Sequence, residues 1–274
     1  MIDAKTKLCC IIGNPVEHSL SPKMHNAGYN ALGLNYTLLA FKVVDLKSAI
    51  AGFRALNVRG IIVTIPHKQE VMKYVDQIDE TAQKIGAVNT IVNTDGQLTA
   101  YNTDWIGALL ALEEKTVLDG KTIAVLGAGG AARAIIYALK TKKTKIFVFN
   151  RSLKQAQELA EDFQLDGAYG LDKTKLISNT DIIINTTPLG MEPHENNSPL
   201  PASSIKETHL IFDIVYTPNR TKLLQLAIKN HARVVYGYKM VLYGGAKIFE
   251  LLTGKKAPLK VMEKALTGGL HKYA

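Results

Sequence analysis

The stretch Lys121–Ala134, KTIAVLGAGGAARA, decides how the rest of the chain is interpreted. Its first part, Thr122–Leu126, is β-branched and apolar throughout, which predicts a strand buried on both faces of a parallel sheet. Gly127, Gly129 and Ala132 then follow the spacing of a GxGxxG/A turn that opens a helix. In such a turn the first glycine permits the tight bend and the second lets the backbone approach a pyrophosphate at the helix N-terminus. The stretch predicts a Rossmann-type dinucleotide site.

The next predicted strand, Lys145–Phe149, indicates which dinucleotide is bound. It ends in Asn150, Arg151 and Ser152, about twenty residues after the glycines, where the adenosine ribose lies in this fold. An NAD site has a carboxylate there to accept from the 2′-hydroxyl, whereas Arg151 and Lys154 suit a 2′-phosphate. The sequence therefore favours NADP, with the alternative that Arg151 only solvates the start of a helix.

Length and composition set the class of protein. With 274 residues, 47% hydrophobic and 21% charged, the chain is long enough for two ordinary globular domains. No apolar run approaches the roughly 20 residues that span a bilayer, and Asp3 lies where a signal peptide would be basic and apolar. We therefore expect a cytoplasmic protein with no membrane partner.

The net charge and the cysteines indicate which ligands and partners to expect. The net charge of +9 favours anionic ligands. The densest basic run, Lys140–Lys145, has no interleaved aromatic residues and is interpreted as a solvated turn, so no nucleic-acid partner is expected. Cys9 and Cys10 are adjacent in a predicted strand and face opposite ways, which predicts neither a disulfide nor a metal site.

Two serines meet a helix start near the N-terminus. The strand Leu8–Ile12 leads through a loop to Ser19, Ser21 and Pro22. Ser21 has the chemistry of an N-cap and Pro22 fits the first helical position. Alternatively, Ser19 and Ser21 together with the helix dipole form a clamp for a small carboxylate. The segment itself leaves both interpretations open.

Two further polar positions follow predicted strands. Thr64 and Lys68 come at the carboxyl end of the strand Gly60–Ile65, where open α/β sheets bind ligands, and a helix is expected to open at Pro66. A lysine in a first helical turn is commonly only a surface residue. Asp104 precedes an apolar helical pattern and has the chemistry of an N-cap.

The remaining pattern alternates strands and helices. Predicted strands are Asn35–Phe41, Ala87–Asn93, Asp181–Asn185, Leu210–Asp213 and Arg233–Tyr236, and predicted helices are Asp45–Leu56, Asp79–Ile85, Trp105–Glu114, Ser152–Phe163 and Thr221–Lys229. A helical tail after Gly237 has no strands of its own. We expect it to pack back onto the first domain.

Taken together, these motifs resemble those of the NADP-dependent shikimate dehydrogenases, in family order over nearly the whole chain. The matching stretches are Gly13–Pro15, His18–Pro22 with His25–Asn26, Val63–Lys68, Gly86–Thr90, Asn102–Asp104, Gly127–Ala132, Asn150–Ser152, Asn185–Thr187 with Gly190–Met191, and Val215–Tyr216 with Pro218.

The resemblance implies an α/β fold with two domains. Residues 1–104, completed by 238–274, would form the N-terminal α/β substrate-binding domain, and 105–237 the Rossmann-type NADP-binding domain. It also implies that Lys68 and Asp104 form the catalytic pair. The positions implied to hold substrate are Ser19, Ser21, Thr64, Asn89, Tyr216 and Gly244. With the glycine turn and the ribose loop, the NADP positions are Gly127, Ala128, Gly129, Gly130, Ala131, Asn150, Arg151, Ser152, Lys154, Thr186, Thr187, Ile214 and Gly237.

The implied activity is the reversible oxidation of shikimate, a small carboxylate, to 3-dehydroshikimate, a step of aromatic amino acid biosynthesis, by a monomer or homodimer. The carboxylate of Asp104 favours protonated Lys68, so which of the two accepts the proton stays open. Gly244 stands where the family has a glutamine that bonds ring hydroxyls. This departure leaves open a quinate or related cyclitol-acid dehydrogenase, and also a non-catalytic dinucleotide-binding paralogue. A short-chain dehydrogenase is disfavoured because over a hundred residues precede Gly127.

Overall fold

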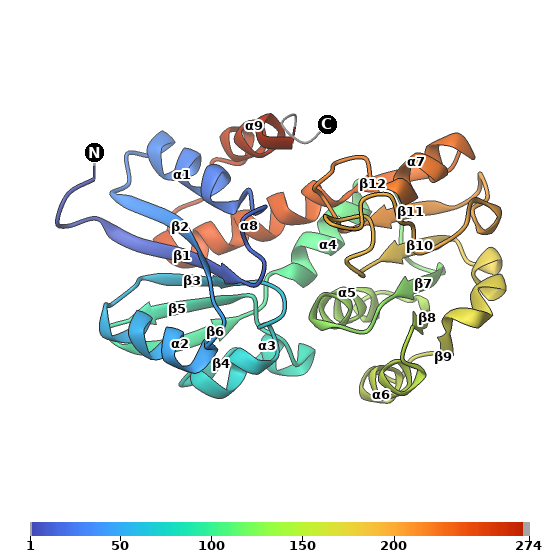
Figure 1. Cartoon of the computed structure of the whole chain (residues 1–274), viewed down its shortest axis with the longest axis horizontal. Coiled ribbons are helices and arrows are strands. Elements are labelled where there is room, and N and C mark those ends of the chain that lie inside the picture. The colour runs from blue at the N-terminus through green and yellow to red at the C-terminus, as the bar shows by residue number, and fades with distance from the viewer. Residues whose placement is uncertain (1, 271–274) are drawn as a thin grey trace. The chain divides into compact units, whose positions relative to one another are not determined.

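The computed structural model describes residues 2–270 and contains two compact units (Figure 1). The first unit extends to Asp104 and is completed by Val241–Gly269, and the second is built on Trp105–Met240. Each unit contains one six-stranded sheet, so the chain has the expected α/β class. In the part of the chain that is described, no helix is both long and apolar enough to cross a membrane.

The first sheet is mixed. Its strand order is β2-β1-β3-β5-β6-β4, with β1 parallel to both β2 and β3, and β5 antiparallel to β3 and β6. The strands are β1 (Lys7–Gly13), β2 (Tyr36–Lys42), β3 (Gly60–Val63), β4 (Gln77–Ile78), β5 (Thr90–Thr94) and β6 (Gln97–Tyr101). The hairpin between β5 and β6 turns at Asp95 and Gly96, both with positive φ, as a two-residue hairpin requires.

Helices complete the first unit. They are α1 (Ser21–Ala31), α2 (Leu46–Ala55), the 3-10 helix η1 (Glu70–Tyr74), α3 (Glu80–Ile85), most of α8 (Gly237–Thr253), and α9 (Leu259–Leu270). The carbonyl of Leu252 in α8 accepts from the Tyr36 hydroxyl at 3.3 Å and from Arg59 Nε at 3.2 Å. The expected return of the C-terminal helices to the first domain is therefore confirmed.

The second sheet is entirely parallel. Its order, β12-β11-β10-β7-β8-β9, places the first strand of this unit, β7, beside its fourth, β10, which is the arrangement of a Rossmann fold. The strands are β7 (Thr122–Leu126), β8 (Lys145–Asn150), β9 (Gly167–Gly170), β10 (Ile182–Asn185), β11 (Leu210–Asp213) and β12 (Arg233–Tyr236). The topology reverses between β7 and β10, so that is where a ligand is expected.

The helical elements of the second unit follow its strands. They are α4 (Asp104–Glu113), which begins at the boundary, α5 (Gly130–Lys140), α6 (Leu153–Phe163), α7 (Lys222–Lys229) and the 3-10 helices η2 (Leu171–Asn179) and η3 (Ala202–Ser204). Leu223, Leu224 and Ala227 of α7 join the buried cluster on one face of the sheet, with Ala124 and Phe149.

The structure corrects three local predictions. Pro66 does not open a helix, because residues 65–69 form turns before η1. The strand expected at Ala87–Asn93 begins only at Thr90. Asp104 is the first residue of α4 rather than a residue before it. The short strands β4 and β9 have no sequence signal of their own, since two to four residues are too few to show a period.

Candidate active site

One edge of the first sheet gathers the polar residues. Ile12 lies beside Val63 at the carboxyl ends of the parallel strands β1 and β3. The antiparallel strand β5 starts at this edge, because Thr90 pairs with both Ile62 and Tyr101. The segments that leave or enter the sheet here carry Ser19, Thr64, Lys68, Asn89 and Asp104.

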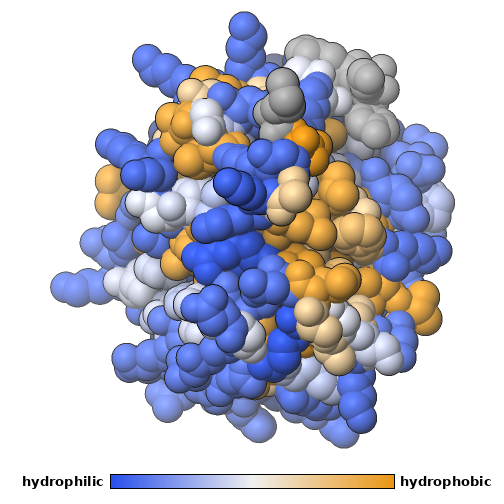
Figure 2. Space-filling model, turned by 90° about the vertical axis from the view of Figure 1, so that its left-hand side faces the viewer, coloured by the Kyte–Doolittle hydropathy of each residue, from blue (hydrophilic) through white to orange (hydrophobic). Residues whose placement is uncertain are grey.

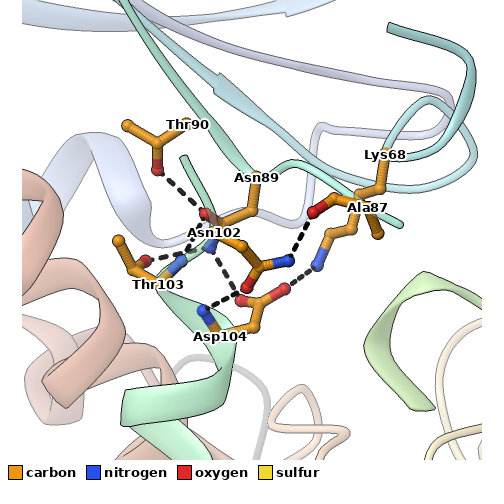
Figure 3. Close-up of polar contacts among 7 residues, drawn as sticks. All are labelled: Lys68, Ala87, Asn89, Thr90, Asn102, Thr103 and Asp104. Carbon is orange, nitrogen blue, oxygen red and sulfur yellow. Dashed lines mark hydrogen bonds and ion pairs between the residues drawn. The ribbon is translucent and has the colours of Figure 1, made fainter. Parts of the chain in front are cut away.

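Lys68 and Asp104 form an ion pair at this edge. Lys68 Nζ donates to Asp104 Oδ2 at 2.5 Å, and the two side chains are only 18% and 15% exposed (Figure 3). The backbone fixes the lysine as well, because the N–H of Val88 donates to the Lys68 carbonyl at 2.7 Å. The two residues are 36 positions apart in the sequence, and the structure brings them into direct contact. A partly desolvated ion pair of this kind is suited to proton transfer.

Asn89 holds the carboxylate of this pair. Its side-chain amide donates to Asp104 Oδ1 at 2.9 Å and to Thr103 Oγ1 at 3.0 Å, and its oxygen accepts from the Thr103 N–H and the Thr90 hydroxyl (Figure 3). An asparagine amide has two donor hydrogens, so both are engaged within the protein. Asn89 therefore positions Asp104, and its contact with substrate stays a prediction.

Asn102 is a positioning residue that the sequence reasoning did not identify. Its side-chain oxygen accepts from the Asp104 N–H at 2.9 Å, and its amide donates to the Ala87 carbonyl at 2.8 Å. The signal for it was present, because asparagine two residues before a helix start commonly bonds the backbone in this way. Asn102 and Asn89 together fix the backbone and the carboxylate of Asp104.

Ser21 is not the N-cap of α1, which was one of the two interpretations of the serine segment. Ser21 is the first residue of α1, and the N-cap position belongs to Leu20, which provides no side-chain hydrogen bond. Ser19 Oγ instead accepts from the Ser21 N–H at 3.3 Å. Ser21 is buried and Ser19 half-buried. Ser19 therefore satisfies the first amide of α1 from outside the N-cap position, and the carboxylate clamp stays a prediction for both hydroxyls.

Gly244 and Thr64 lie close to other members of the site. A Cβ at Gly244 in α8 would lie 3.3 Å from the carbonyl oxygen of Thr103, so this position faces the segment that carries Asp104. The methyl group of Thr64 lies against Gly13, where a Cβ would approach it to 2.5 Å. Gly244 is therefore near the segment that carries the ion pair, and Thr64 is near the ends of β1 and β3.

In the second unit, the glycine turn meets the end of β10. Gly127 has a φ of +107°, and a Cβ there would lie 2.5 Å from Thr186 Oγ1. The Thr186 hydroxyl donates to the Leu126 carbonyl at 2.7 Å, while the backbone N–H and hydroxyl of Thr187 donate to Asn185 Oδ1. Gly127, Thr186 and Thr187, predicted separately as cofactor residues, are therefore neighbours at the topological switch point.

The start of α5 suits a phosphate. Gly129 is the N-cap with extended backbone, no side chain caps the helix, and a Cβ on Gly129 would meet nothing within 4 Å. Its predicted neighbours Ala128, Gly130 and Ala131 are small. Open amides at a helix N-terminus beside free space are the features a pyrophosphate needs. The residues present therefore fit the NADP that the sequence predicts.

The adenosine end of this site carries positive charge. Asn150 ends β8, and its amide donates to the Ser152 carbonyl at 3.1 Å. Ser152 caps α6, accepting from the Gln155 N–H at 3.4 Å. Arg151 is exposed, and Lys154 is 86% exposed with Glu158 3.8 Å away. Both cations are accessible to a 2′-phosphate at the position where the ribose lies in this fold.

A buried polar pair joins the loops after β10 and β11, which carry the predicted NADP positions Thr186, Thr187 and Ile214. Asn185 Nδ2 donates to Asp213 Oδ1 at 2.9 Å, and Asp213 also accepts from the Val215 N–H at 3.1 Å and the Thr221 hydroxyl at 2.7 Å. Burial raises the pKa of Asp213 to about 7, while these hydrogen bonds act in the opposite direction. The sequence reasoning gave neither Asn185 nor Asp213 a role, although polar residues that end two predicted parallel strands are a usable signal.

The same loops bring Ile214 and Gly237 together. A Cβ at Gly237 would lie 2.5 Å from the Ile214 carbonyl oxygen, so only glycine allows this approach of two backbones. Tyr216 lies half-buried in the loop after β11. It belongs to the second unit, whereas the other predicted substrate residues belong to the first.

Comparisons with known proteins identify the family of the chain. The model described as the shikimate dehydrogenase substrate binding domain matches residues 11–91, and that of shikimate / quinate 5-dehydrogenase matches residues 109–221. The shikimate dehydrogenase (NADP(+)) of Methanobrevibacter smithii is 47% identical over 97% of this chain and 98% of its own length.

Solved structures extend the similarity to the fold. A crystal structure of shikimate dehydrogenase in complex with NADP+ is 43% identical, covers 100% of this chain and 98% of its own, and has a TM-score of 0.90. The shikimate 5-dehydrogenase of Thermus thermophilus in complex with NADP(H) and shikimate is 34% identical, with 96% and 99% coverage and a TM-score of 0.88. On these matches, the chain belongs to the shikimate dehydrogenase family.

Proposed function

We propose that this chain is an NADP-dependent shikimate dehydrogenase in which Lys68 and Asp104 carry the proton transfer. The observation that supports this most directly is the 2.5 Å ion pair between them, held by Asn89 in a chain of this family. Relatives of matching length are named shikimate dehydrogenase (NADP(+)), which supports the reaction and the cofactor.

The chemistry divides between the cofactor and the protein. NADP+, when bound, supplies the acceptor for the hydride that leaves the alcohol carbon. The protein must bind the ring and take the proton from the hydroxyl oxygen. Lys68 Nζ and Asp104 Oδ2 already share a hydrogen bond, so the pair accepts this proton as a unit. In the reverse direction it returns the proton to the oxygen of the ketone.

The first unit would bind the acidic ring. Ser19 and Ser21 offer hydroxyls beside the start of α1, where the helix dipole favours a carboxylate. Asn89 bonds Asp104 directly, and Gly244 faces the Thr103 segment. Thr64 at the end of β3 and Tyr216 after β11 are the other residues that we propose for the substrate. A pure binding protein would have no need for a proton-transfer pair, so this arrangement argues against a non-catalytic paralogue.

The glycine at position 244 supports the alternative that the enzyme acts on a substrate other than shikimate. Glycine provides no side-chain hydrogen bond, and the space beside the Thr103 carbonyl is left to the ligand or to water. A quinate or related cyclitol acid with an additional ring substituent would use that space. The reaction type and the cofactor are the same for both substrates.

We propose that the enzyme acts in the cytoplasm, where it catalyses a step of aromatic amino acid biosynthesis. The test is a steady-state panel of shikimate and quinate, each with NADP+ and NAD+. We expect the largest kcat/KM for shikimate with NADP+. A preference for quinate would support the alternative substrate, and NADP+ binding without turnover of either acid would overturn the enzymatic assignment.

A further inference from the structure

Apolar side chains reach the surface of both units. Figure 2 shows hydrophobic residues gathered on a face of the first unit. In the second unit, apolar residues on one face of the sheet border a partly open cavity of about 170 Å³. The cavity is lined by Thr122, Phe147, Phe149, Tyr169, Leu176, Asn179 and Thr180. An apolar cavity of about 150 Å³ holds one benzene molecule, so this one has room for a single six-membered ring.

Three aromatic rings form one wall of the cavity. Phe147 and Phe149 of β8 pair with Gly167 and Tyr169 of β9, which places all four residues on the same face of the sheet. The Tyr169 ring lies back over Gly167, where a Cβ would approach the Tyr169 hydroxyl oxygen to 3.0 Å and the Phe147 ring to 3.1 Å. The ring centroid of Tyr169 is 6.1 Å from that of Phe147 and 5.3 Å from that of Phe149. The glycine therefore makes room for the tyrosine ring in this wall.

The 3-10 helix η2 covers the cavity only in part. Ile177 of η2 is fully buried and joins the core cluster on this face of the sheet. The preceding Leu176 lines the cavity and is 44% exposed, so it lies at the edge of the opening. A ligand can therefore enter past Leu176 while Ile177 keeps η2 packed on the sheet.

Positive charge lies beside the cavity at the amino ends of the strands. Lys145 begins β8 and pairs with Thr122, a cavity residue, so its side chain is on the same face of the sheet as the cavity. Asp181 is the acidic residue bonded to this edge, and its carboxylate already accepts from the Thr122 N–H at 2.8 Å and lies 3.5 Å from Lys121 Nζ. Within residues 2–270, no carboxylate forms an ion pair with Lys145. Its ammonium group is therefore available to an anionic ligand.

We propose that this cavity is a second ligand site, which takes a small aromatic carboxylate. The ring lies against Phe147, Phe149 and Tyr169, since aromatic rings pack favourably edge to face or offset. The carboxylate accepts from Lys145 and from the Tyr169 hydroxyl, which makes no hydrogen bond to the part of the chain that is described. The hydroxyl lies over Gly167 beside Phe147, and Lys145 is two residues before Phe147, about 7 Å along the strand. A lysine side chain spans that distance.

The walls exclude the ligands of the other two sites. A ring acid with several hydroxyls, such as shikimate, would leave those hydroxyls without partners against aromatic walls. The cavity also lies away from the glycine turn, because Thr122 begins β7 whereas Gly127 follows its other end, about 16 Å along the strand. Asn179 and Thr180 precede β10 at the same amino end as Thr122. An aromatic carboxylate should therefore bind independently of NADP+ and of shikimate.

Ligand-observed NMR titration of the full chain with benzoate tests the site. One series contains saturating NADP+ and the other saturating shikimate, so that neither turns over. We expect a dissociation constant of about 0.1 to 5 mM for benzoate in both series, as for a ligand of this size. Benzamide, the neutral compound of the same shape, should bind at least about fivefold more weakly. Acetate, which lacks the ring, should show no saturable binding.

Two variants with matched controls locate the binding. Leu176→Trp fills the cavity from its edge and should weaken benzoate binding at least about tenfold. Leu171→Trp is the control, because Leu171 begins the same helix, is 42% exposed and does not line the cavity. Lys145→Gln should remove the preference for benzoate over benzamide. Lys229→Gln, at the end of α7, is the control for the loss of one positive charge.

Each outcome decides the proposal. Benzoate binding in both series that Leu176→Trp weakens, together with a charge preference that Lys145→Gln removes, supports it. No saturable binding up to about 20 mM, displacement of benzoate by NADP+ or shikimate, equal affinities in the two tryptophan variants, or a preference that survives Lys145→Gln would overturn it. Thermal unfolding of each variant verifies the fold, and the lysine variant decides the result if Leu176→Trp is poorly folded. The titration requires no turnover, so it is independent of the proposed function.

Discussion

The two candidate sites use different parts of the chain. In the first unit, the side chains of Lys68 and Asn89 both donate directly to the Asp104 carboxylate. In the second unit, the glycine turn and the start of α5 present backbone, and the main feature is the absence of a side chain at Gly127 and Gly129. Proton transfer requires positioned titratable groups, whereas phosphate binding requires close approach of backbone amides. The first site is therefore sensitive to the loss of side chains and the second to their addition.

Removing a side chain from the first site should have the largest effect. We expect Lys68→Ala to lower kcat for shikimate oxidation by about 10³-fold, because it removes half of the proton-transfer pair. The affinity for NADP+, measured by fluorescence titration, should be nearly unchanged. Lys84→Ala removes a lysine paired with Glu80 on the exposed surface of α3 and serves as the control. A Lys68→Ala enzyme that keeps most of its activity would exclude this residue from the mechanism.

Asp213 is the exception in the second site, because it is a buried side chain whose pKa is raised to about 7 by burial. The folded carboxyl keeps its proton up to about pH 7, while the unfolded one loses it near 3.8. Its contribution to stability is therefore fully present below about pH 4 and is lost as the pH rises through 7. Between these limits we expect the free energy of unfolding to fall by roughly 1 to 2 kcal/mol per pH unit from this group.

Denaturant unfolding of the wild type and of Asp213→Asn, from pH 4 to pH 8, measures this contribution. The asparagine keeps an acceptor for Asn185 and Val215 but has no proton to lose. The difference between the two unfolding free energies should therefore change with pH in that window. If the two proteins show parallel pH profiles, Asp213 is already ionised in the folded state.

Adding a methyl group should separate two glycines of the turn. Gly127→Ala forces a side chain into the positive φ region and against Thr186, so we expect a loss of about 1 to 3 kcal/mol in unfolding free energy. Gly129→Ala places its methyl in open space and should cost under about 1 kcal/mol of stability. Its main effect should be about tenfold weaker NADP+ binding, measured by calorimetry. Equal stability losses in both variants would contradict this division of roles.

Arg151 tests whether a side chain also matters at the phosphate end. Arg151→Gln should weaken NADP+ binding about 10- to 100-fold and leave NAD+ binding nearly unchanged, because only NADP+ carries the 2′-phosphate. Arg233→Gln, at the start of β12, is the control for loss of one positive charge in this unit. A parallel loss of affinity for both cofactors would show that Arg151 acts on the fold of the turn rather than on the phosphate.

We expect the smallest change in activity from substitutions of Gly244, the position in the first site that has no side chain. Gly244→Gln restores an amide beside the Thr103 segment and should lower the KM for shikimate by up to about tenfold. The 3.3 Å contact with the Thr103 carbonyl offsets part of this gain. Gly244→Ala fills space without offering a hydrogen bond and separates the two contributions. If Gly244→Gln instead raises the KM, the glycine is making room for the substrate.

The sequence predicted five of the six strands of the second unit and missed β9. Strands β11 and β12 and the helix after Thr221 were predicted within one residue, because buried parallel strands are continuous apolar runs and the caps are chemically distinct. The same reasoning failed at Pro66, where residues 65–69 form turns and the Lys68 carbonyl accepts from the Val88 N–H, a partner distant in the sequence. Local sequence patterns therefore predict helices and strands well, and the segments that connect them poorly.

For the sites, the sequence supplied the residue types but not all of their partners. The pairing of Lys68 with Asp104 came from the family resemblance, since no local pattern links positions so far apart. The hydrogen bonds of Asn102 and Asp213 were missed because each depends on a strand end being placed beside another segment. Such long-range polar contacts carry no periodic signal in a single sequence.

The discontinuous first unit affects how the protein emerges from the ribosome. The sheet of the second unit is complete once Tyr236 has been synthesised, whereas Tyr36 and Arg59 near the start of the chain wait for Leu252 in α8. The segment made first is therefore the last to finish burying its apolar surface. During translation, the nascent N-terminal half must stay soluble with an incomplete core while the downstream half folds ahead of it.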